Sequence, residues 1–267
     1  MKKEDEGYEE YKRQQSKYKL VKDIMSKGVV TISEEVTMAE AAKIMGEKHI
    51  GSLVVEGGET PWGIVTERDL LSRFLGIDGK IVPVRVKECM STPLITIPPE
   101  ITIKEAAKTM MTKKGRLVVF KDEKLVGIVT TSDLVKVLPE CLETIVNCNE
   151  YMTKKVVSVD EDTTIIAVAT IMGEKRIGSV IVNRDGEPFG IFTERDLLTS
   201  FLAKGKTLQS KVGESASSPL ITIPTGTSVH QAAYIMVTKH VRRLPIMKEN
   251  NMVGIITARD LVEAYTK

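Results

Sequence analysis

Gly63-Ile64-Val65-Thr66-Glu67-Arg68-Asp69 is a string that returns three more times along the chain. The later copies are Gly127-Ile128-Val129-Thr130-Thr131-Ser132-Asp133, Gly190-Ile191-Phe192-Thr193-Glu194-Arg195-Asp196 and Gly254-Ile255-Ile256-Thr257-Ala258-Arg259-Asp260. The steps between successive copies are 64, 63 and 64 residues. Recurrence at such a constant step indicates four tandem structural repeats.

The first and third repeats are closer to each other than to their neighbours. Met25–Leu75 and Met152–Leu202 share 27 identities in 51 positions, and the string at Pro93–Pro98 reappears at Pro219–Pro224. The order is therefore A-B-A′-B′, which is the pattern expected when a module of two repeats is duplicated whole.

Each repeat alternates between strand and helix periodicity. A β-branched stretch opens it, two further short strands end at the recurring string, and a second helix is predicted to start at the Thr of that string. The opening stretches are Val29–Ile32, Leu94–Ile97, Val156–Val159 and Leu220–Ile223. The helix between the first and second strands carries apolar residues at i, i+3, i+4 and i+7: Met38, Ala41, Ala42, Met45; Ile103, Ala106, Ala107, Met110; Ile165, Val168, Ala169, Met172; Val229, Ala232, Ala233, Met236. The sequence thus predicts an α+β fold of four β-α-β-β-α repeats, with these stripes in the core.

The domain organisation follows from the repeats. We expect a charged N-terminal arm at 1–20 and repeats at 21–78, 86–140, 148–204 and 212–267. About 60 residues make a small core, so face-to-face pairing of repeats would bury more apolar surface per residue. The predicted pairs are the modules 21–140 and 148–267, joined near Leu138–Asn149, where Pro139 and a polar run interrupt the pattern.

Composition and charge argue against several classes of function. The chain of 267 residues is 42% hydrophobic and 28% charged, with a formal net charge of +2, which argues against a strong global field for nucleic acid. No apolar run approaches the ~20 residues of a membrane span, and residues 1–20 lack the apolar stretch of a secretory signal, so we expect a cytoplasmic protein. The three histidines are scattered and the three cysteines form no CxxC pair, so no metal site is predicted.

The recurring Thr-x-x-Asp has two interpretations. Its layout at a strand-to-helix transition is that of a capping box, with Thr at N-cap and Asp at N3. However, a capping box prefers Glu or Gln at N3, whose arm is longer, and the glycine that precedes each copy lets another group approach the strand closely. The alternative is a ligand role, with Thr near phosphate and Asp accepting hydrogen bonds from a ribose diol.

These repeats resemble the CBS domain, whose pairs are called Bateman modules. The resemblance rests on the β-α-β-β-α order ending in Gly-apolar-x-Thr-x-x-Asp and on openings such as Val21–Met25 and Val86–Met90, and it covers about residues 20–267. The four tandem copies are similar in layout to the regulatory γ subunit of AMP-activated protein kinase. The resemblance implies that AMP, ADP, ATP or S-adenosylmethionine binds in clefts between paired repeats.

Site residues are carried over from the family by position. The ribose would be held by Asp69, Asp133, Asp196 and Asp260, and ribose or phosphate by Thr66, Arg68, Thr130, Thr193, Arg195, Thr257 and Arg259. Adenine or phosphate would lie near Gly28, Gly51, Ser52, Pro93, Gly115, Arg116, Lys155, Gly178, Ser179, Pro219, Arg242 and Arg243. The odd repeats offer Gly-Ser where the even repeats offer arginine, so four equivalent sites are not expected. Because arginine matches phosphate, we expect phosphate groups on the arginine side and more highly charged ligands in the second module.

Three function classes fit a chain of this kind to different degrees. The favoured one is a non-catalytic sensor of energy or metabolite state whose adenosyl ligand modulates an unidentified protein partner. An enzyme is disfavoured because the repeats occupy about 245 residues and a catalytic barrel needs roughly 250 more. A DNA- or RNA-binding regulator is the alternative, disfavoured by the near-zero net charge. Closure of a single chain into a disc and formation of a homodimer both remain open.

Overall fold

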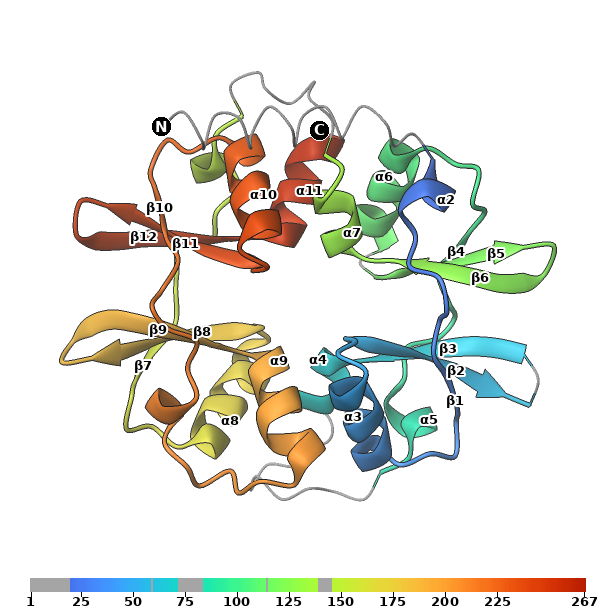
Figure 1. Cartoon of the computed structure of the whole chain (residues 1–267), viewed down its shortest axis with the longest axis horizontal. Coiled ribbons are helices and arrows are strands. Elements are labelled where there is room, and N and C mark those ends of the chain that lie inside the picture. The colour runs from blue at the N-terminus through green and yellow to red at the C-terminus, as the bar shows by residue number, and fades with distance from the viewer. Residues whose placement is uncertain (1–19, 59, 72–83, 114, 139–145) are drawn as a thin grey trace. The chain divides into compact units, whose positions relative to one another are not determined.

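The computed structural model describes residues 20–58, 60–71, 84–113, 115–138 and 146–267 (Figure 1). The predicted charged arm, except Leu20, lies outside the described residues, as do most of the link between the first two repeats and most of the seam between the two predicted modules.

All four repeats build the same small sheet. Its first and second strands are parallel and its second and third are antiparallel, in the order in which they occur along the chain. Repeat 1 comprises β1 (Thr31–Ser33), α3 (Met38–Glu47), β2 (Ser52–Gly57), β3 (Thr60–Thr66) and α4 (Glu67–Asp69); repeat 2 comprises β4 (Thr96–Ile97), α6 (Ile103–Lys113), β5 (Leu117–Lys121), β6 (Lys124–Val129) and α7 (Thr131–Val135). Repeat 3 comprises β7 (Ser158–Asp160), α8 (Ile165–Lys175), β8 (Ser179–Arg184), β9 (Glu187–Thr193) and α9 (Glu194–Asp196); repeat 4 comprises β10 (Ile223–Pro224), α10 (Val229–Thr238), β11 (Arg243–Lys248), β12 (Asn251–Thr257) and α11 (Ala258–Thr266). The α+β class and the β-α-β-β-α order are confirmed.

The core lies between each sheet and its first helix. All sixteen predicted stripe residues are buried, none more than 4% exposed. Threonine or serine begins these helices: Thr37 and Ser228 accept from the backbone N–H of the third helical residue, whose own Glu or Gln side chain accepts in return. The stripe and its cap together fix which helix face meets the sheet.

Two compact units emerge from the packing, each containing alternate repeats. One unit holds the sheets of repeats 1 and 3, in residues 30–94 and 157–220, and the other holds those of repeats 2 and 4 together with the N-terminal segment. In the odd-repeat unit, Leu198 of repeat 3 packs into the core around α3, and Leu71 of repeat 1 packs into the core around α8. In the even-repeat unit a single apolar cluster contains both repeats. The predicted pairing into modules 21–140 and 148–267 stays a prediction.

The predicted first strands begin two or three residues too early. The structure starts β1 at Thr31 instead of Val29 and β10 at Ile223 instead of Leu220. The reason is that the chain passes from one unit to the other within these stretches, at Val29/Val30 and at Leu220/Ile221. Val29 and Leu220 therefore belong to a different unit from the sheets that begin at Thr31 and Ile223.

The opening segments, which we define as residues 20–28, 85–93, 146–155 and 211–219, lie on the sheet of the neighbouring repeat. Ser26 of the first segment pairs with Ile128 in β6 through two backbone hydrogen bonds of 2.9 and 3.0 Å. Ser91 pairs in the same way with Ile64 in β3. The corresponding bridges of the other two segments are Thr153 with Ile255 and Ser217 with Ile191. The opening segment of each repeat thus pairs with the third strand of the repeat that precedes or follows it in the chain.

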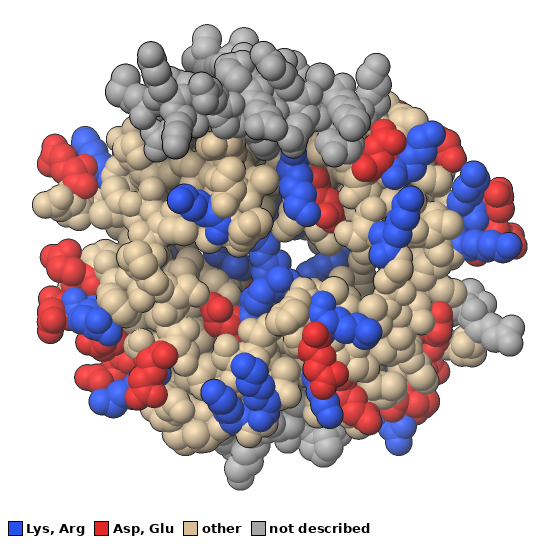
Figure 2. Space-filling view, in the orientation of Figure 1, with Lys and Arg blue, Asp and Glu red and all other residues tan. Residues whose placement is uncertain are grey.

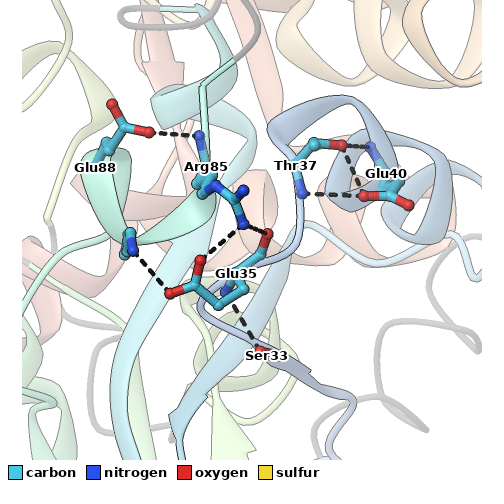
Figure 3. A network of polar contacts seen from close by, with 7 residues as sticks. Ser33, Glu35, Thr37, Glu40, Arg85 and Glu88 are labelled. Carbon is cyan, nitrogen blue, oxygen red and sulfur yellow. Dashed lines mark hydrogen bonds and ion pairs between the residues drawn. The ribbon is translucent and has the colours of Figure 1, made fainter.

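Polar contacts fix the second segment, which contains α5 (Val86–Cys89), at its place in the odd-repeat unit (Figure 3). Arg85 donates from Nη1 to both the backbone carbonyl and Oε2 of Glu35, at 3.1 and 2.7 Å. Lys87 donates to Oε1 of the same carboxylate at 2.7 Å. The exposed Glu35 therefore joins the loop before α3 to the segment that covers the sheet.

Candidate functional site

The recurring motif lies where the second strand begins and the third strand ends. In repeat 1, Ser52 pairs with Thr66, and the backbone N–H of Glu67 donates to the carbonyl of Gly51 at 3.2 Å. The same register joins Ser179 to Thr193 in repeat 3 and Arg243 to Thr257 in repeat 4. The hydrogen bond to the preceding residue recurs as Glu194 to Gly178 at 3.1 Å and Ala258 to Arg242 at 2.9 Å. The structure therefore places the predicted residues at the start of the second strand beside the predicted motif Thr.

The motif Asp closes a capping box in all four repeats. One carboxylate oxygen, Oδ2, accepts from both the backbone N–H and the hydroxyl of the motif Thr, at distances between 2.7 and 3.0 Å. The preference for Glu or Gln at N3 does not prevent the shorter Asp from capping here, because the extended backbone of the Thr holds its N–H within reach of the carboxylate. Both of these bonds use Oδ2, so the cap contacts with Thr do not require Oδ1.

The four motif carboxylates differ in their surroundings. Asp133 is 8% exposed, and its Oδ1 lies 3.6 Å from Nζ of Lys136. Burial raises the pKa of Asp260 above its ordinary value, and the hydrogen bonds from Thr257 oppose that shift. Desolvation of a carboxylate strengthens any hydrogen bond that it accepts, so Asp133 and Asp260 are suitable acceptors for a hydroxyl group.

The remaining predicted residues, Gly28, Pro93, Lys155 and Pro219, lie at the ends of the opening segments. Ser91 is paired antiparallel with Ile64 in β3, so Pro93, two residues later, lies farther from Thr66 along the strand. The carbonyl of Ile95 then accepts from the backbone N–H of Val118 at 2.8 Å, at the second strand of its own repeat. The carbonyls of Val30 and Val157, two residues after Gly28 and Lys155, accept in the same way from Val54 and Ile181. The assignment of these four residues to a ligand stays a prediction.

The glycine at the start of each motif is closely approached, as predicted, but the approaching group is protein. A Cβ at Gly63 would lie 2.5 Å from Sδ of Met90, and one at Gly254 would lie 2.5 Å from Sδ of Met152. At Gly190 the nearest atom is the backbone oxygen of Ser217, at 2.9 Å. Because this glycine has no side chain, the opening segment can pack directly against the strand.

The motif arginines of the odd repeats pair with glutamates of the opposite odd repeat. Nε of Arg68 lies 3.2 Å from Oε1 of Glu194, and Nε of Arg195 lies 3.0 Å from Oε1 of Glu67. The sequence analysis missed the two glutamates. The available signal was that Glu-Arg occurs within the motif only in the odd copies, where α4 and α9 approach each other.

Arginines also stand at the equivalent second-strand positions of the even repeats. Arg116, Arg242 and Arg243 are partly buried, whereas Arg259, on α11, is exposed. Arg243 lies at the start of β11 opposite Thr257, so its positive charge belongs to the same site as Asp260. Gly115 and Arg116 precede β5 directly, which is the corresponding place in repeat 2.

A family model named "CBS domain" matches residues 21–76, 86–140, 148–203 and 212–267. The chain belongs to the CBS-domain family. The resemblance stated from the motif residues is thus confirmed for the family, and each of the four repeats is a CBS repeat.

Curated relatives share part or all of this chain. It is 36% identical over 121 residues to the uncharacterized protein MK0525 of Methanopyrus kandleri, covering 44% of this chain and 62% of that one. It is 26% identical to the uncharacterized protein MJ1404 of Methanocaldococcus jannaschii, covering 91% of this chain and 61% of the relative. The chain therefore spans about three fifths of the length of these two relatives.

Solved structures share the fold of this chain. The crystal structure of MJ1225 from Methanocaldococcus jannaschii, which has been proposed as an archaeal homologue of g-AMPK, has a TM-score of 0.75 and 23% identity, covering 92% of this chain and 99% of that one. An uncharacterized conserved protein from Pyrococcus horikoshii has a TM-score of 0.64 with the same identity and coverage. At these identities the likeness concerns the fold.

The last observations concern metal-ligating side chains, helix length and surface charge in the described part of the chain. Among its residues no group of three or more His, Cys, Asp and Glu side chains could hold a metal ion, and none of its helices is long and apolar enough to cross a membrane. Lys and Arg side chains are interspersed with Asp and Glu around the rim of the face that Figure 2 shows.

Proposed function

We propose that this CBS-domain protein is a non-catalytic regulatory protein that binds an adenosyl ligand and modulates a protein partner according to energy or metabolite state. The candidate ligands are AMP, ADP, ATP and S-adenosylmethionine. The observation that carries the proposal is the repeated site in which a capped Asp, its Thr and the start of the second strand meet an opening segment.

The motif Asp suits a ribose because its two oxygens have separate tasks. Oδ2 is held by the Thr N–H and hydroxyl, which fixes the side-chain rotamer. Oδ1 can then accept from a ribose hydroxyl at little further entropic cost, because the side chain is already ordered. A charge-assisted hydrogen bond of this kind is worth about 1.5–3 kcal/mol.

Calorimetric titration of the full chain with adenosine, AMP, ADP, ATP and S-adenosylmethionine tests the proposal. Asp→Asn variants at Asp69, Asp133, Asp196 and Asp260 keep an oxygen for the cap and replace Oδ1 by an amide, so they test ribose binding apart from helix capping. We expect each substitution at an occupied site to weaken binding by about 10- to 150-fold, from the bond energy above.

Glu40→Gln is the matched control, because Glu40 caps α3 through the same contacts with Thr37 but lies outside every motif. Its affinity for adenosyl compounds should equal that of the parent. Unchanged affinity in all four Asp→Asn variants would refute the ribose assignment, and lack of binding by the parent would refute the function.

The non-catalytic character is tested separately. We expect no turnover of ATP, IMP or S-adenosylmethionine by the purified chain, and product formation that persists through further purification would contradict the proposal.

Nucleic-acid binding is the alternative function. The formal net charge of +2 favours the small-molecule proposal, because polynucleotide binding is typical of strongly basic domains. Polynucleotide affinity that falls steeply with salt would instead support the alternative.

A further inference from the structure

Glu67 and Glu194 are buried carboxylates at the second-helix position that follows the motif Thr in the odd CBS repeats. They are 3% and 8% exposed. A carboxylate that loses its water at this depth stays ionised only when a cation and hydrogen bonds replace that water. Each glutamate obtains its cation from the opposite odd repeat: Arg195 serves Glu67, and Arg68 serves Glu194.

The two ion pairs change what the motif arginines offer a ligand. Arg68 and Arg195 are the guanidinium groups of the odd repeats that family position assigns to ribose or phosphate. In this structure each one donates from Nε to a buried carboxylate, so a phosphate would have to displace or share with a negative charge that is already in place. That competition lowers the affinity for anions at these positions.

The carboxylate of Glu67 also borders the start of the second strand. A Cβ on Gly51 would lie 3.0 Å from Cδ of Glu67 and 3.1 Å from each of its oxygens. Gly51 and Ser52 are the residues that face Thr66 in the site of repeat 1. The acidic group therefore lies beside the same backbone that is predicted to enclose the ligand, where it would repel a phosphate.

The even repeats have the opposite character at both positions. Thr131 and Ala258 replace the two glutamates; arginine replaces the serine at Arg116, beside the retained Gly115, and replaces both residues at Arg242-Arg243. The odd repeats thus place a Glu–Arg ion pair beside the motif, whereas the even repeats have arginine there and no glutamate at the equivalent motif position. The compact unit to which each repeat belongs alternates in the same order.

We propose that Glu67 and Glu194 are specificity-determining residues, which make the sites of repeats 1 and 3 bind adenosyl compounds without phosphate and leave phosphorylated ones to repeats 2 and 4. The ligand class for the odd repeats is an adenosyl group with a neutral or cationic tail. The inference rests on the proposed function and adds to it the chemical class that each site accepts.

Titration of paired variants tests the division. Asp69→Asn with Asp196→Asn should weaken adenosine and S-adenosylmethionine at least about tenfold, the lower end for a lost charge-assisted bond, and change ATP affinity less than twofold. Asp133→Asn with Asp260→Asn should weaken ATP by at least about tenfold. ATP affinity that falls as far in the first pair as in the second would overturn the inference and leave the function standing. The inference would also be overturned if the protein with Asp69→Asn and Asp196→Asn bound both adenosine and S-adenosylmethionine as tightly as the parent.

The glutamates themselves are tested by Glu67→Gln with Glu194→Gln, which keeps size and hydrogen bonding but removes both charges. We expect the number of ATP molecules bound per chain to rise in this variant. The matched control is Glu35→Gln with Asp162→Asn, which removes two carboxylates from exposed ion pairs of the same unit, with Arg85 and Lys211, away from the motifs.

The outcomes separate the two proposals. An unchanged ATP stoichiometry in a folded Glu67→Gln, Glu194→Gln protein, or an equal rise in the control, would overturn the inference. If melting shows that this variant does not fold, the Asp→Asn pairs decide the question alone. A parent chain that binds none of adenosine, AMP, ADP, ATP and S-adenosylmethionine would refute the proposed function and the inference with it.

Discussion

Gly46 and Gly173 occupy equivalent places in the first helices of repeats 1 and 3, yet substitution by alanine should have opposite effects. A Cβ at Gly46 would lie 2.3 Å from Cβ of Ala203, far inside the ~3.5–4 Å of a carbon contact. A Cβ at Gly173 would meet only the backbone oxygen of Leu71, at an ordinary 3.5 Å. The same chemical change is therefore blocked in one helix and accommodated in the other.

The magnitudes follow from two opposing terms. Alanine gains up to about 1 kcal/mol over glycine inside a helix, and overpacking a core by one methyl group costs roughly 1–3 kcal/mol. Gly46→Ala should lower the free energy of unfolding by up to about 2 kcal/mol, whereas Gly173→Ala should raise it by up to about 1 kcal/mol. Urea unfolding, followed by the fluorescence of Trp62, measures both, because this single tryptophan lies in the unit that contains the two glycines.

Ala203→Gly completes the test as a double-mutant cycle. Combined with Gly46→Ala, it removes the atom that the new methyl group strikes, and it should recover most of the lost stability. If Gly46→Ala were as stabilising as Gly173→Ala, or if Ala203→Gly gave no recovery, the steric reasoning would be refuted.

Three further expectations concern the motif. Gly190→Ala should destabilise more than Gly63→Ala in thermal melts, because the first strikes a backbone oxygen of the opening segment and the second a flexible methionine side chain. Asp69→Ala should cost about 0.5–2 kcal/mol in urea unfolding through loss of its cap, whereas Asp69→Asn should cost less; equal losses would contradict a capping role. Since burial raises the folded-state pKa of Asp260, its ionisation weakens the fold above that pKa and not below the unfolded value. Asp260→Asn should therefore be more stable relative to the parent at pH 7 than at pH 3, and a reversed order in urea unfolding would contradict this.

The sequence predicted the parts of this fold that local patterns encode. Spacing of apolar residues identified the buried face of α3 and its three equivalents, and recurrence of the motif placed the strand-to-helix transitions. The ends of the first strands were misplaced because they depend on where the chain changes unit, and Val29 is as suitable for a strand as Thr31.

The sequence assigned the candidate site residues but not how the segments around them assemble. Family position supplied Asp69 and Thr66, whereas the pairing of Ser91 with Ile64 of the same motif depends on the exchange of opening segments, which no local pattern encodes. The Glu67–Arg195 ion pair joins residues 128 positions apart. The Glu-Arg dipeptide recurs in both odd copies of the motif, but this repetition indicates a contact only when α4 and α9 are known to approach each other.

The exchanged opening segments also set an order for folding during synthesis. Ser26 is synthesised early, but its pairing partner Ile128 follows about a hundred residues later. The first sheet likewise lacks the pairing of Ile64 until Ser91 has been synthesised. Contacts this distant in sequence close slowly, because loop entropy is lost before any contact repays it. A ribosome must therefore release nearly two complete repeats before either can reach its final form, and chains stalled after one repeat should expose the strand that Ser91 would have covered.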